Sequence, residues 1–260
     1  MHKHRPPQAV FQGPHLLYAP ARRILQLRSV CRRHTPVQAQ AGELTAVISG
    51  TANTDGIGRA CVREFLQAGY RVVGLDINPP QDEGDDEILS RFKSQYKMLE
   101  TDVSEEESVR ASVEEACEFL GGQITSLVNN AGIALSGMSE EPGQRVASFK
   151  KFISVNLVGM FIVSEACLPF MPDGQSSIVN ISSIQATSSW PNTEGYASAK
   201  SGILGLTRAQ AVSLDKKVRV NTVLPGWIVT PGSQARLTQD IHDWHLTGLP
   251  PSPPSPRPFF

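Results

Sequence analysis

The feature that most constrains the fold is a glycine-rich segment between a short apolar run and an amphipathic one. Residues 44–49 (LTAVIS) are apolar in the way of a buried strand, and apolar residues recur with helical spacing after residue 58. Strand, glycine-rich turn and helix are the context of a dinucleotide-binding loop, because glycines let the backbone approach a pyrophosphate and the helix start offers free N–H groups. The candidate loop residues are Gly50, Thr51, Gly56, Ile57 and Gly58.

A second apolar run, Arg71–Asp76, ends in an acid that lies 20 residues after Gly56. This is about where a ribose-binding carboxylate is expected in such a unit. A carboxylate accepts hydrogen bonds from a 2′-hydroxyl and repels a 2′-phosphate. Asp76 therefore favours NAD(H) over NADP(H), with a solvated acid at a strand end as the alternative interpretation.

Apolar runs and helical patterns continue to alternate up to residue 224. Strands are expected at 96–100, 124–128 and 178–181, and helices at about 105–120, where Ser104 to Glu107 read as a capping box, and at 146–170. This alternation predicts one α/β domain over residues 43–249, built from right-handed βαβ units as a doubly wound parallel sheet. Small and amide-bearing residues follow the 124–128 strand and suit a cofactor crevice: Asn130, Ala131 and Gly132.

Three residues near the fifth expected strand have a joint chemical use. Ser183 follows that strand, and Tyr196 and Lys200 lie one turn apart on the next helical pattern. A free tyrosine ionises at about pH 10, and a fixed cation nearby lowers that pKa toward a range useful for proton transfer. The serine hydroxyl is placed to hydrogen-bond the same substrate oxygen. An isolated Tyr-x-x-x-Lys is more often a packing tyrosine with a solvated lysine, so the rest of the chain has to decide.

Composition excludes several classes of function. The six histidines all lie near the two ends and none falls between residues 43 and 241, which argues against a Ser-His-Asp hydrolase or a histidine-ligated metal site. The four cysteines show no metal or disulfide spacing. Residues 43–260 hold 17 of the 24 Lys and Arg and all 25 Asp and Glu, so nucleic-acid binding is disfavoured. The sequence contains no run of about 18 apolar residues, so a membrane span is not expected.

The two ends differ from the body of the chain. Residues 1–42 contain seven Lys and Arg, no acid and several prolines, the composition of an organelle-targeting presequence. VQAQA before Gly42 resembles plastid processing sites, which favours the chloroplast; the scarcity of serine leaves the mitochondrion open, and a disordered basic tail is the plain alternative. Residues 250–260 (PPSPPSPRPFF) cannot be helical, because proline lacks the amide donor.

Together these segments resemble the classical short-chain dehydrogenase/reductase family over residues 44–249. The resemblance rests on the glycine loop, the Asp102-Val103 pair, residues 129–132 (NNAG) and the Pro225-Gly226 pair, in this order. Ser183 and Tyr196 also have the family's spacing of thirteen residues. The residues that match the catalytic set of the family are Asn156, Ser183, Tyr196 and Lys200.

The resemblance implies a Rossmann fold and hydride transfer between a nicotinamide cofactor and a secondary alcohol or ketone. Tyr196 would exchange a proton with the substrate oxygen, which Ser183 would polarise. Lys200 would bind the nicotinamide ribose and lower the pKa of the tyrosine, and Asn156 would hold a water in a proton relay. The resemblance assigns further positions to the cofactor: Asp102 at the adenine, Thr230 at the carboxamide, and Val103, Asn130, Ala131, Gly132, Pro225, Gly226 and Ile228. Family members form homodimers or tetramers.

Two departures from the family pattern bear on function. The loop aligns either with Ala52 at the first glycine or with Gly50 there and two residues inserted, and Asp55 adds a negative charge. After Leu249 the family continues with a helix and a strand that this chain is expected to lack. We therefore expect an NAD-dependent oxidoreductase acting on a small molecule, with an inactive truncated isoform that keeps only nucleotide binding or subunit pairing as the alternative.

Overall fold

The structure is a computed structural model that describes residues 44–78, 87–133, 138–139, 141–226 and 228. The expected presequence (1–42) and the proline-rich tail (250–260) lie outside the described residues. So does the segment where the family's last helix and strand would follow, and the expected lack of those elements stays a prediction. Every feature below belongs to the unit formed by residues 39–236.

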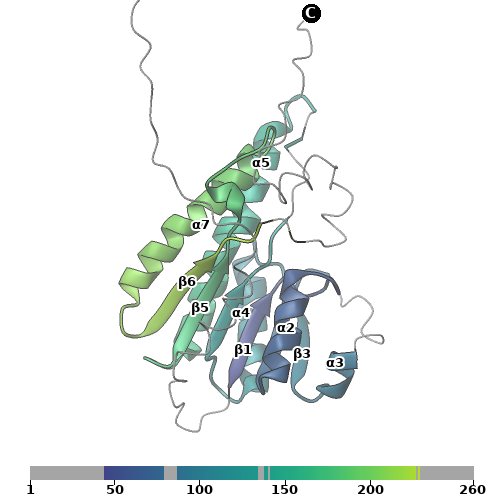
Figure 1. Ribbon diagram of the computed structural model, residues 1–260, viewed down its shortest axis with the longest axis vertical. Coiled ribbons are helices and arrows are strands. Elements are labelled where there is room, and N and C mark those ends of the chain that lie inside the picture. Colours follow the sequence, from purple (N-terminus) through teal and green to yellow (C-terminus); the bar gives the residue numbers. More distant parts are fainter. Residues whose placement is uncertain (1–43, 79–86, 134–137, 140, 227, 229–260) are drawn as a thin grey trace, which may run out of the picture. The chain divides into compact units, whose positions relative to one another are not determined.

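The described residues form one six-stranded sheet (Figure 1). All neighbouring strands are parallel and their order is β3-β2-β1-β4-β5-β6. The predicted doubly wound α/β fold is confirmed, with the strand order reversing between β1 and β4. The strands are β1 (Thr45–Ser49), β2 (Arg71–Asp76), β3 (Tyr96–Glu100), β4 (Ser126–Asn129), β5 (Ser176–Ile181) and β6 (Val218–Val223).

Helices cover both faces of the sheet, which explains why β1 is buried at all five positions. Side chains alternate along a strand, so Ala46 and Ile48 pack with α2 while Val47 packs with α4 on the other face. The helical elements are α2 (Ile57–Gln67), α3 (Glu87–Arg91), α4 (Glu106–Leu120), α5 (Arg145–Ile153), η4 (Ser154–Val158), α6 (Gly159–Cys167), η5 (Leu168–Phe170), η6 (Ile184–Ala186) and α7 (Glu194–Ser213).

The helix expected over residues 146–170 is present but not uniform. A single π-helical turn, η4, separates α5 from α6, and Asn156 lies inside that turn. Such turns occur often at functional positions. This continuous helix, Arg145–Phe170, is the one helix among the described residues that is long and apolar enough to cross a membrane.

The predicted capping box at Ser104 is wrong. Helix α4 begins at Glu106, and no side-chain hydrogen bond caps it. The Ser104 hydroxyl instead donates to Asp102 Oδ1 over 2.6 Å, and the Ser104 N–H donates to the same oxygen over 2.9 Å. The carboxylate of Asp102 competes for the serine because it lies only two residues away, as in an Asx turn.

Candidate active site

Gly50 places the end of β1 directly against the end of β4. Its backbone is left-handed, with φ of +77°, a conformation that L residues other than glycine rarely adopt. A Cβ atom there would lie 2.8 Å from the Ala131 Cα and 2.7 Å from the Asn130 Nδ2. Of the two alignments of the loop, the structure favours the one with Gly50 in the close-packing role.

The start of α2 packs against the same loop. A Cβ atom on Gly58 would lie 2.0 Å from the Gly50 carbonyl oxygen, so only glycine allows this approach. Arg59, fully buried, donates through Nε to the Thr51 carbonyl over 2.8 Å and through Nη2 to the Ala52 carbonyl over 3.3 Å. Arg59 is not among the residues predicted from the sequence, because its position after the glycines does not show that the side chain turns back toward the loop.

Asp76 lies at the carboxyl end of β2, beside the loop. Its Oδ2 accepts a hydrogen bond from the Ala52 N–H over 2.8 Å, and its Oδ1 accepts from the Asn78 N–H over 3.0 Å. Asp76 therefore orders the loop itself, a contact that the sequence analysis did not foresee. A carboxylate has about four acceptor positions, so these bonds leave room for a ribose hydroxyl.

Residues after β4 are fastened to β1 by Ser49. Its Oγ accepts from the Asn130 N–H and from the Ala131 N–H, each over 3.0 Å. The Asn130 side chain donates back to the carbonyls of Ser49 and Gly50, also over 3.0 Å. The sequence analysis missed Ser49, because a serine at a strand end has no distinctive pattern. These bonds hold the two strand ends at the point where the strand order reverses.

A cleft of about 770 Å³ lies above this point. Ligands of open α/β sheets bind at such switch points, beyond the carboxyl ends of the strands. The expected cofactor residues that line it are Gly50, Asp76, Asp102, Val103, Asn130, Ala131 and Gly132, and other lining residues include Ala52, Asn53, Ile133, Lys150 and Lys151. Thr51 is fully buried beneath the loop, and Gly56, Ile57 and Gly58 form the start of α2.

Asn156 is fully buried and joins η4 to the segment after β4. Its Oδ1 accepts from the Ile133 N–H over 2.8 Å, and its Nδ2 donates to the Ile133 carbonyl over 3.3 Å. Gly132 allows this approach, since a Cβ atom there would lie 2.6 Å from Oδ1. Asn156 thus bonds the backbone of a cleft residue, which accounts for an asparagine inside a helix. Its expected role in holding a water stays a prediction.

The three remaining expected catalytic residues meet beyond β5. Ser183 follows the strand, and its side chain lies near Tyr196, in the first turn of α7, and lowers the pKa of that phenol. Lys200, one turn later, is 4 % exposed and donates from Nζ to the Ile181 carbonyl over 2.8 Å. Its Nζ lies 5.6 Å from the centroid of the Tyr196 ring. None of the three is among the residues that line the cleft described above.

Burial shifts the pKa of two of these three residues. Burial raises the pKa of Tyr196, and the hydrogen bond from Ser183 lowers it by a smaller amount. Burial also lowers the pKa of Lys200 to about 8. Burial is thus the largest influence on both groups, and the lysine ammonium is directed to a backbone carbonyl. The expectation that Lys200 lowers the pKa of the phenol stays a prediction.

The last expected cofactor residues follow β6. The Pro225 carbonyl accepts from the Ile184 N–H over 3.1 Å, which brings this segment beside the residue after Ser183. Gly226 is exposed and Ile228 is 47 % exposed. Thr230 lies outside the described residues.

Comparison with known proteins shows which family has this fold and these motifs. The family model described as enoyl-(acyl carrier protein) reductase matches residues 50–248. The chain belongs to the short-chain dehydrogenase/reductase family. This membership makes the chain an NAD(P)-dependent oxidoreductase in kind, and it confirms the resemblance found in the sequence.

Two solved short-chain dehydrogenase/reductase structures and one curated sequence illustrate the relationship. An uncharacterized oxidoreductase of Bacillus subtilis is 37 % identical over 193 residues, which are 72 % of this chain and 67 % of that protein. The ligand-free aldohexose dehydrogenase of Thermoplasma acidophilum is 32 % identical with a TM-score of 0.64, covering 75 % of this chain and 70 % of the other. Carveol dehydrogenase of Mycobacterium avium in complex with NAD is 28 % identical with a TM-score of 0.62, covering 71 % of each chain.

Proposed function

We propose that this protein is an NAD-dependent dehydrogenase or ketone reductase that acts on a small secondary alcohol or ketone. The observation that carries the proposal is the contact between the Ser183 and Tyr196 side chains, with the buried Lys200 one helical turn away. Two hydroxyls that lie this near each other can both reach one substrate oxygen. The tyrosine transfers the proton and the serine holds the oxygen in place.

The cleft fits the cofactor that this function needs. The close approach of Gly50 and Gly58 leaves bare backbone where a pyrophosphate would lie, and the start of α2 directs free N–H groups there. Asp76 and Asp102 lie at the rim that an adenosine would occupy. When bound, the nicotinamide cofactor supplies or accepts the hydride; Lys200 would contact its ribose.

The preference for NAD(H) rests on Asp76. Its carboxylate lines the cleft beside the loop, where a negative charge repels a 2′-phosphate and accepts from a 2′-hydroxyl. We expect the purified protein to bind NADH at least about ten-fold more tightly than NADPH by calorimetry. Asp76→Asn, which keeps an oxygen for the Ala52 N–H, should narrow that ratio. Equal or tighter NADPH binding by the unaltered protein would refute the preference.

Tyr196→Phe tests the reaction. We expect it to abolish oxidation or reduction of any substrate that a panel of secondary alcohols and ketones identifies. NADH affinity should stay within about three-fold, because the substitution removes only the phenol oxygen and leaves Lys200 and its bond to the Ile181 carbonyl in place. Turnover that survives in Tyr196→Phe would be incompatible with the proposal.

The alternative function is an inactive isoform that retains nucleotide binding or subunit pairing. The raised pKa of Tyr196 supports this alternative for the oxidation of an alcohol, since less of the phenol is ionised at neutral pH and able to accept a proton. Saturable NADH binding together with no turnover across the whole panel would support it. Turnover of any panel substrate that Tyr196→Phe abolishes would exclude it.

We also propose that the chain forms homodimers or tetramers and spans no membrane. The continuous helix from α5 to η5 packs on α4 and α7, and its exposed apolar residues form a stripe that a second copy could cover: Val146, Phe149, Val158 and Phe161. Analytical ultracentrifugation should give at least a dimer, and Phe161→Asp should shift it toward monomer. A monomer at micromolar concentration would refute the pairing.

For the cellular address we propose the plastid, with the mitochondrion as the alternative. The acid-free, arginine-rich composition of residues 1–42 supports an organelle presequence. A fluorescent protein fused behind these residues should collect in plastids of a plant or algal cell, and diffuse fluorescence would refute targeting.

A further inference from the structure

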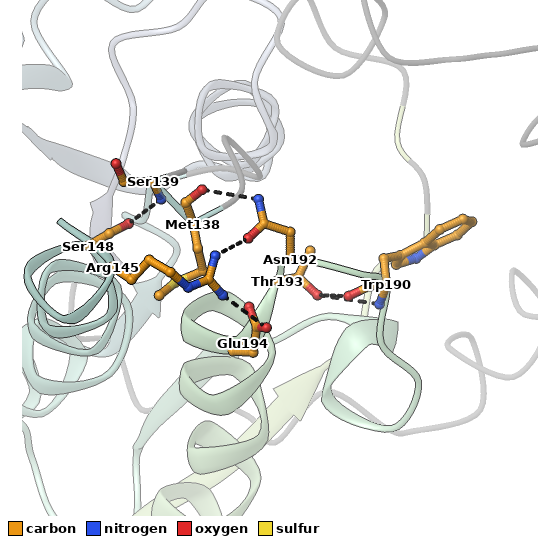
Figure 2. A network of polar contacts seen from close by, with 8 residues as sticks. All are labelled: Met138, Ser139, Arg145, Ser148, Trp190, Asn192, Thr193 and Glu194. Atoms are coloured by element: carbon orange, nitrogen blue, oxygen red, sulfur yellow. Dashed lines mark hydrogen bonds and ion pairs between the residues drawn. The ribbon is translucent and has the colours of Figure 1, made fainter. Parts of the chain in front are cut away.

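A network of polar contacts joins the start of α7 to the start of α5 and to the segment containing Met138 (Figure 2). Asn192 lies at its centre, four residues before Tyr196. Its carbonyl accepts from the Met138 N–H over 2.9 Å, and its side-chain Nδ2 donates to the Met138 carbonyl over 3.0 Å. Two segments 54 residues apart in the sequence are thus joined by a reciprocal pair of hydrogen bonds.

Asn192 also reaches α5. Its Oδ1 accepts from Nη1 of Arg145 over 2.9 Å. Arginine only donates and a carbonyl only accepts, so the oxygen of the amide has to face Arg145 and the nitrogen has to face Met138. The oxygen and the nitrogen of this side-chain amide are therefore both hydrogen-bonded. We call Met138, Arg145 and Asn192 the Asn192 clamp.

The backbone of Asn192 is as unusual as its contacts. Its φ is +63°, a left-handed conformation that asparagine tolerates better than most residues because its short polar side chain can bond locally. Only one other non-glycine residue of the described chain, Lys216, shares this conformation. The turn at Asn192 directs the chain into α7, whose first backbone bond runs from the Ala197 N–H to the Thr193 carbonyl over 2.8 Å.

The start of α7 also makes an apolar contact with Met138 and Phe152. A Cβ atom on Gly195 would lie 3.0 Å from the Met138 sulfur and 2.9 Å from Cδ2 of Phe152, so the helix start lies flush against both side chains. Phe152, on α5, meets Tyr196 edge to face, with ring centroids 6.3 Å apart and planes at 85°. The ring that carries the hydroxyl thus packs on Phe152, and the residue before it packs on Phe152 and Met138.

We propose that Asn192 is a positioning residue for the reaction at Tyr196, acting through its bonds to Met138. The proposal rests on the proposed function. The two bonds of Asn192 join Met138 directly to the turn that leads into the first turn of α7. Loss of the side-chain bond leaves the two segments joined by the backbone bond alone, so the helix start can shift. A displacement of about 1 Å of a reacting group can reduce turnover about a hundred-fold.

The outer part of the network is a different matter. Glu194 accepts from Nη2 of Arg145 over 3.2 Å, and the two side chains are 58 % and 48 % exposed. Exposed ion pairs of this kind contribute little, because water and salt screen them. Trp190 points away from the clamp in Figure 2. The positioning role is therefore assigned to Asn192 and not to the ion pair.

The test uses the full chain and the variant Asn192→Gly, which keeps the left-handed backbone at no steric cost and removes the side chain. Lys216→Gly is the matched control, because it makes a glycine at the other left-handed position, and Glu194→Gln tests the outer ion pair. Two assays are used. The first gives kcat and the KM for NADH with a substrate from the panel, and the second titrates the Tyr196 phenol by ultraviolet absorbance, with the Tyr196→Phe signal subtracted.

We expect Asn192→Gly to lower kcat about ten-fold or more and to leave the KM for NADH within two-fold, while both controls match the unaltered protein. The phenol titration should move to lower pH, because burial is the larger influence on Tyr196 and a loosened helix start admits water. A kcat within two-fold of the unaltered protein, or a titration no lower in pH, overturns the proposal.

Two further cases are covered: a variant that does not fold, and an unaltered protein for which no substrate is found. If Asn192→Gly does not fold, Asn192→Asp takes its place: it is nearly the same size and still accepts from Arg145, but has no N–H for the Met138 carbonyl, so we expect the same loss. If no substrate is turned over by the unaltered protein, the proposed function fails, while a shifted phenol titration still supports the positioning role and an unshifted one overturns it.

Discussion

Gly50→Ala is the sharpest test of how the loop is built. The substitution adds one methyl group at a residue with φ of +77°, where the new Cβ would lie 2.8 Å from the Ala131 Cα and 2.9 Å from its nitrogen. Both neighbours are backbone atoms held by Ser49, so they cannot turn aside as a flexible side chain would. Either the loop or the end of β4 has to move.

Two effects add at this position and can be separated. The left-handed backbone costs about 1–2 kcal/mol for a residue with a Cβ, and the forced contact costs about 1–3 kcal/mol more. Gly69 is a matched control, because it has φ of +87° and a Cβ there meets nothing within 4 Å. Gly69→Ala should therefore lose about 1–2 kcal/mol, and Gly50→Ala about 2–5 kcal/mol.

Urea unfolding followed by circular dichroism measures these losses, and calorimetry measures NADH affinity. We expect Gly50→Ala to weaken NADH binding about ten-fold or more, since each ten-fold is only about 1.4 kcal/mol, and Gly69→Ala to leave it unchanged. Gly58→Ala, which has the close contact without the left-handed backbone, should resemble Gly50→Ala in binding. Equal losses of stability and affinity in Gly50→Ala and Gly69→Ala would refute the close-approach argument.

Three other predictions follow from buried groups. Burial lowers the pKa of Lys200 from 10.5 to about 8, so between these two pH values the unfolded chain binds more protons than the native one. The free energy of unfolding should therefore rise with pH over this range, by on the order of 3 kcal/mol relative to the variant Lys200→Met. The variant keeps the cysteines, so their titration cancels in the comparison. A difference that stays flat from pH 7 to 10 would contradict this. Asn156→Ala should lose about 2–4 kcal/mol in urea unfolding, because the N–H and carbonyl of Ile133 lose their partners; a loss below about 0.5 kcal/mol would show that water replaces them. Ser49→Ala removes the acceptor of two amides and should lower NADH affinity several-fold in calorimetry, an expectation that unchanged affinity would defeat.

Local patterns were sufficient to predict the sheet. Buried strands of a doubly wound fold are short, apolar and rich in β-branched residues, and β1 and β2 show this directly. Spacing along one helix was sufficient to pair Tyr196 with Lys200, since residues four apart share a face. The capping box failed because a competing partner for Ser104 lay two residues upstream, and sequence proximity alone does not say which partner wins.

The sequence by itself determined the fold class and the position of the glycine-rich loop, and it predicted the catalytic set, because each depends on residues close together in the chain or on a motif with fixed spacing. Only the tertiary structure decided the contacts that cross the chain: Ser49 with residues 130–131, Asn156 with Ile133, and Asn192 with Met138. It also decided the burial of Tyr196 and Lys200, which shifts the pKa of both groups. Burial depends on every element packed around a group, so desolvation cannot be read from neighbours in the sequence.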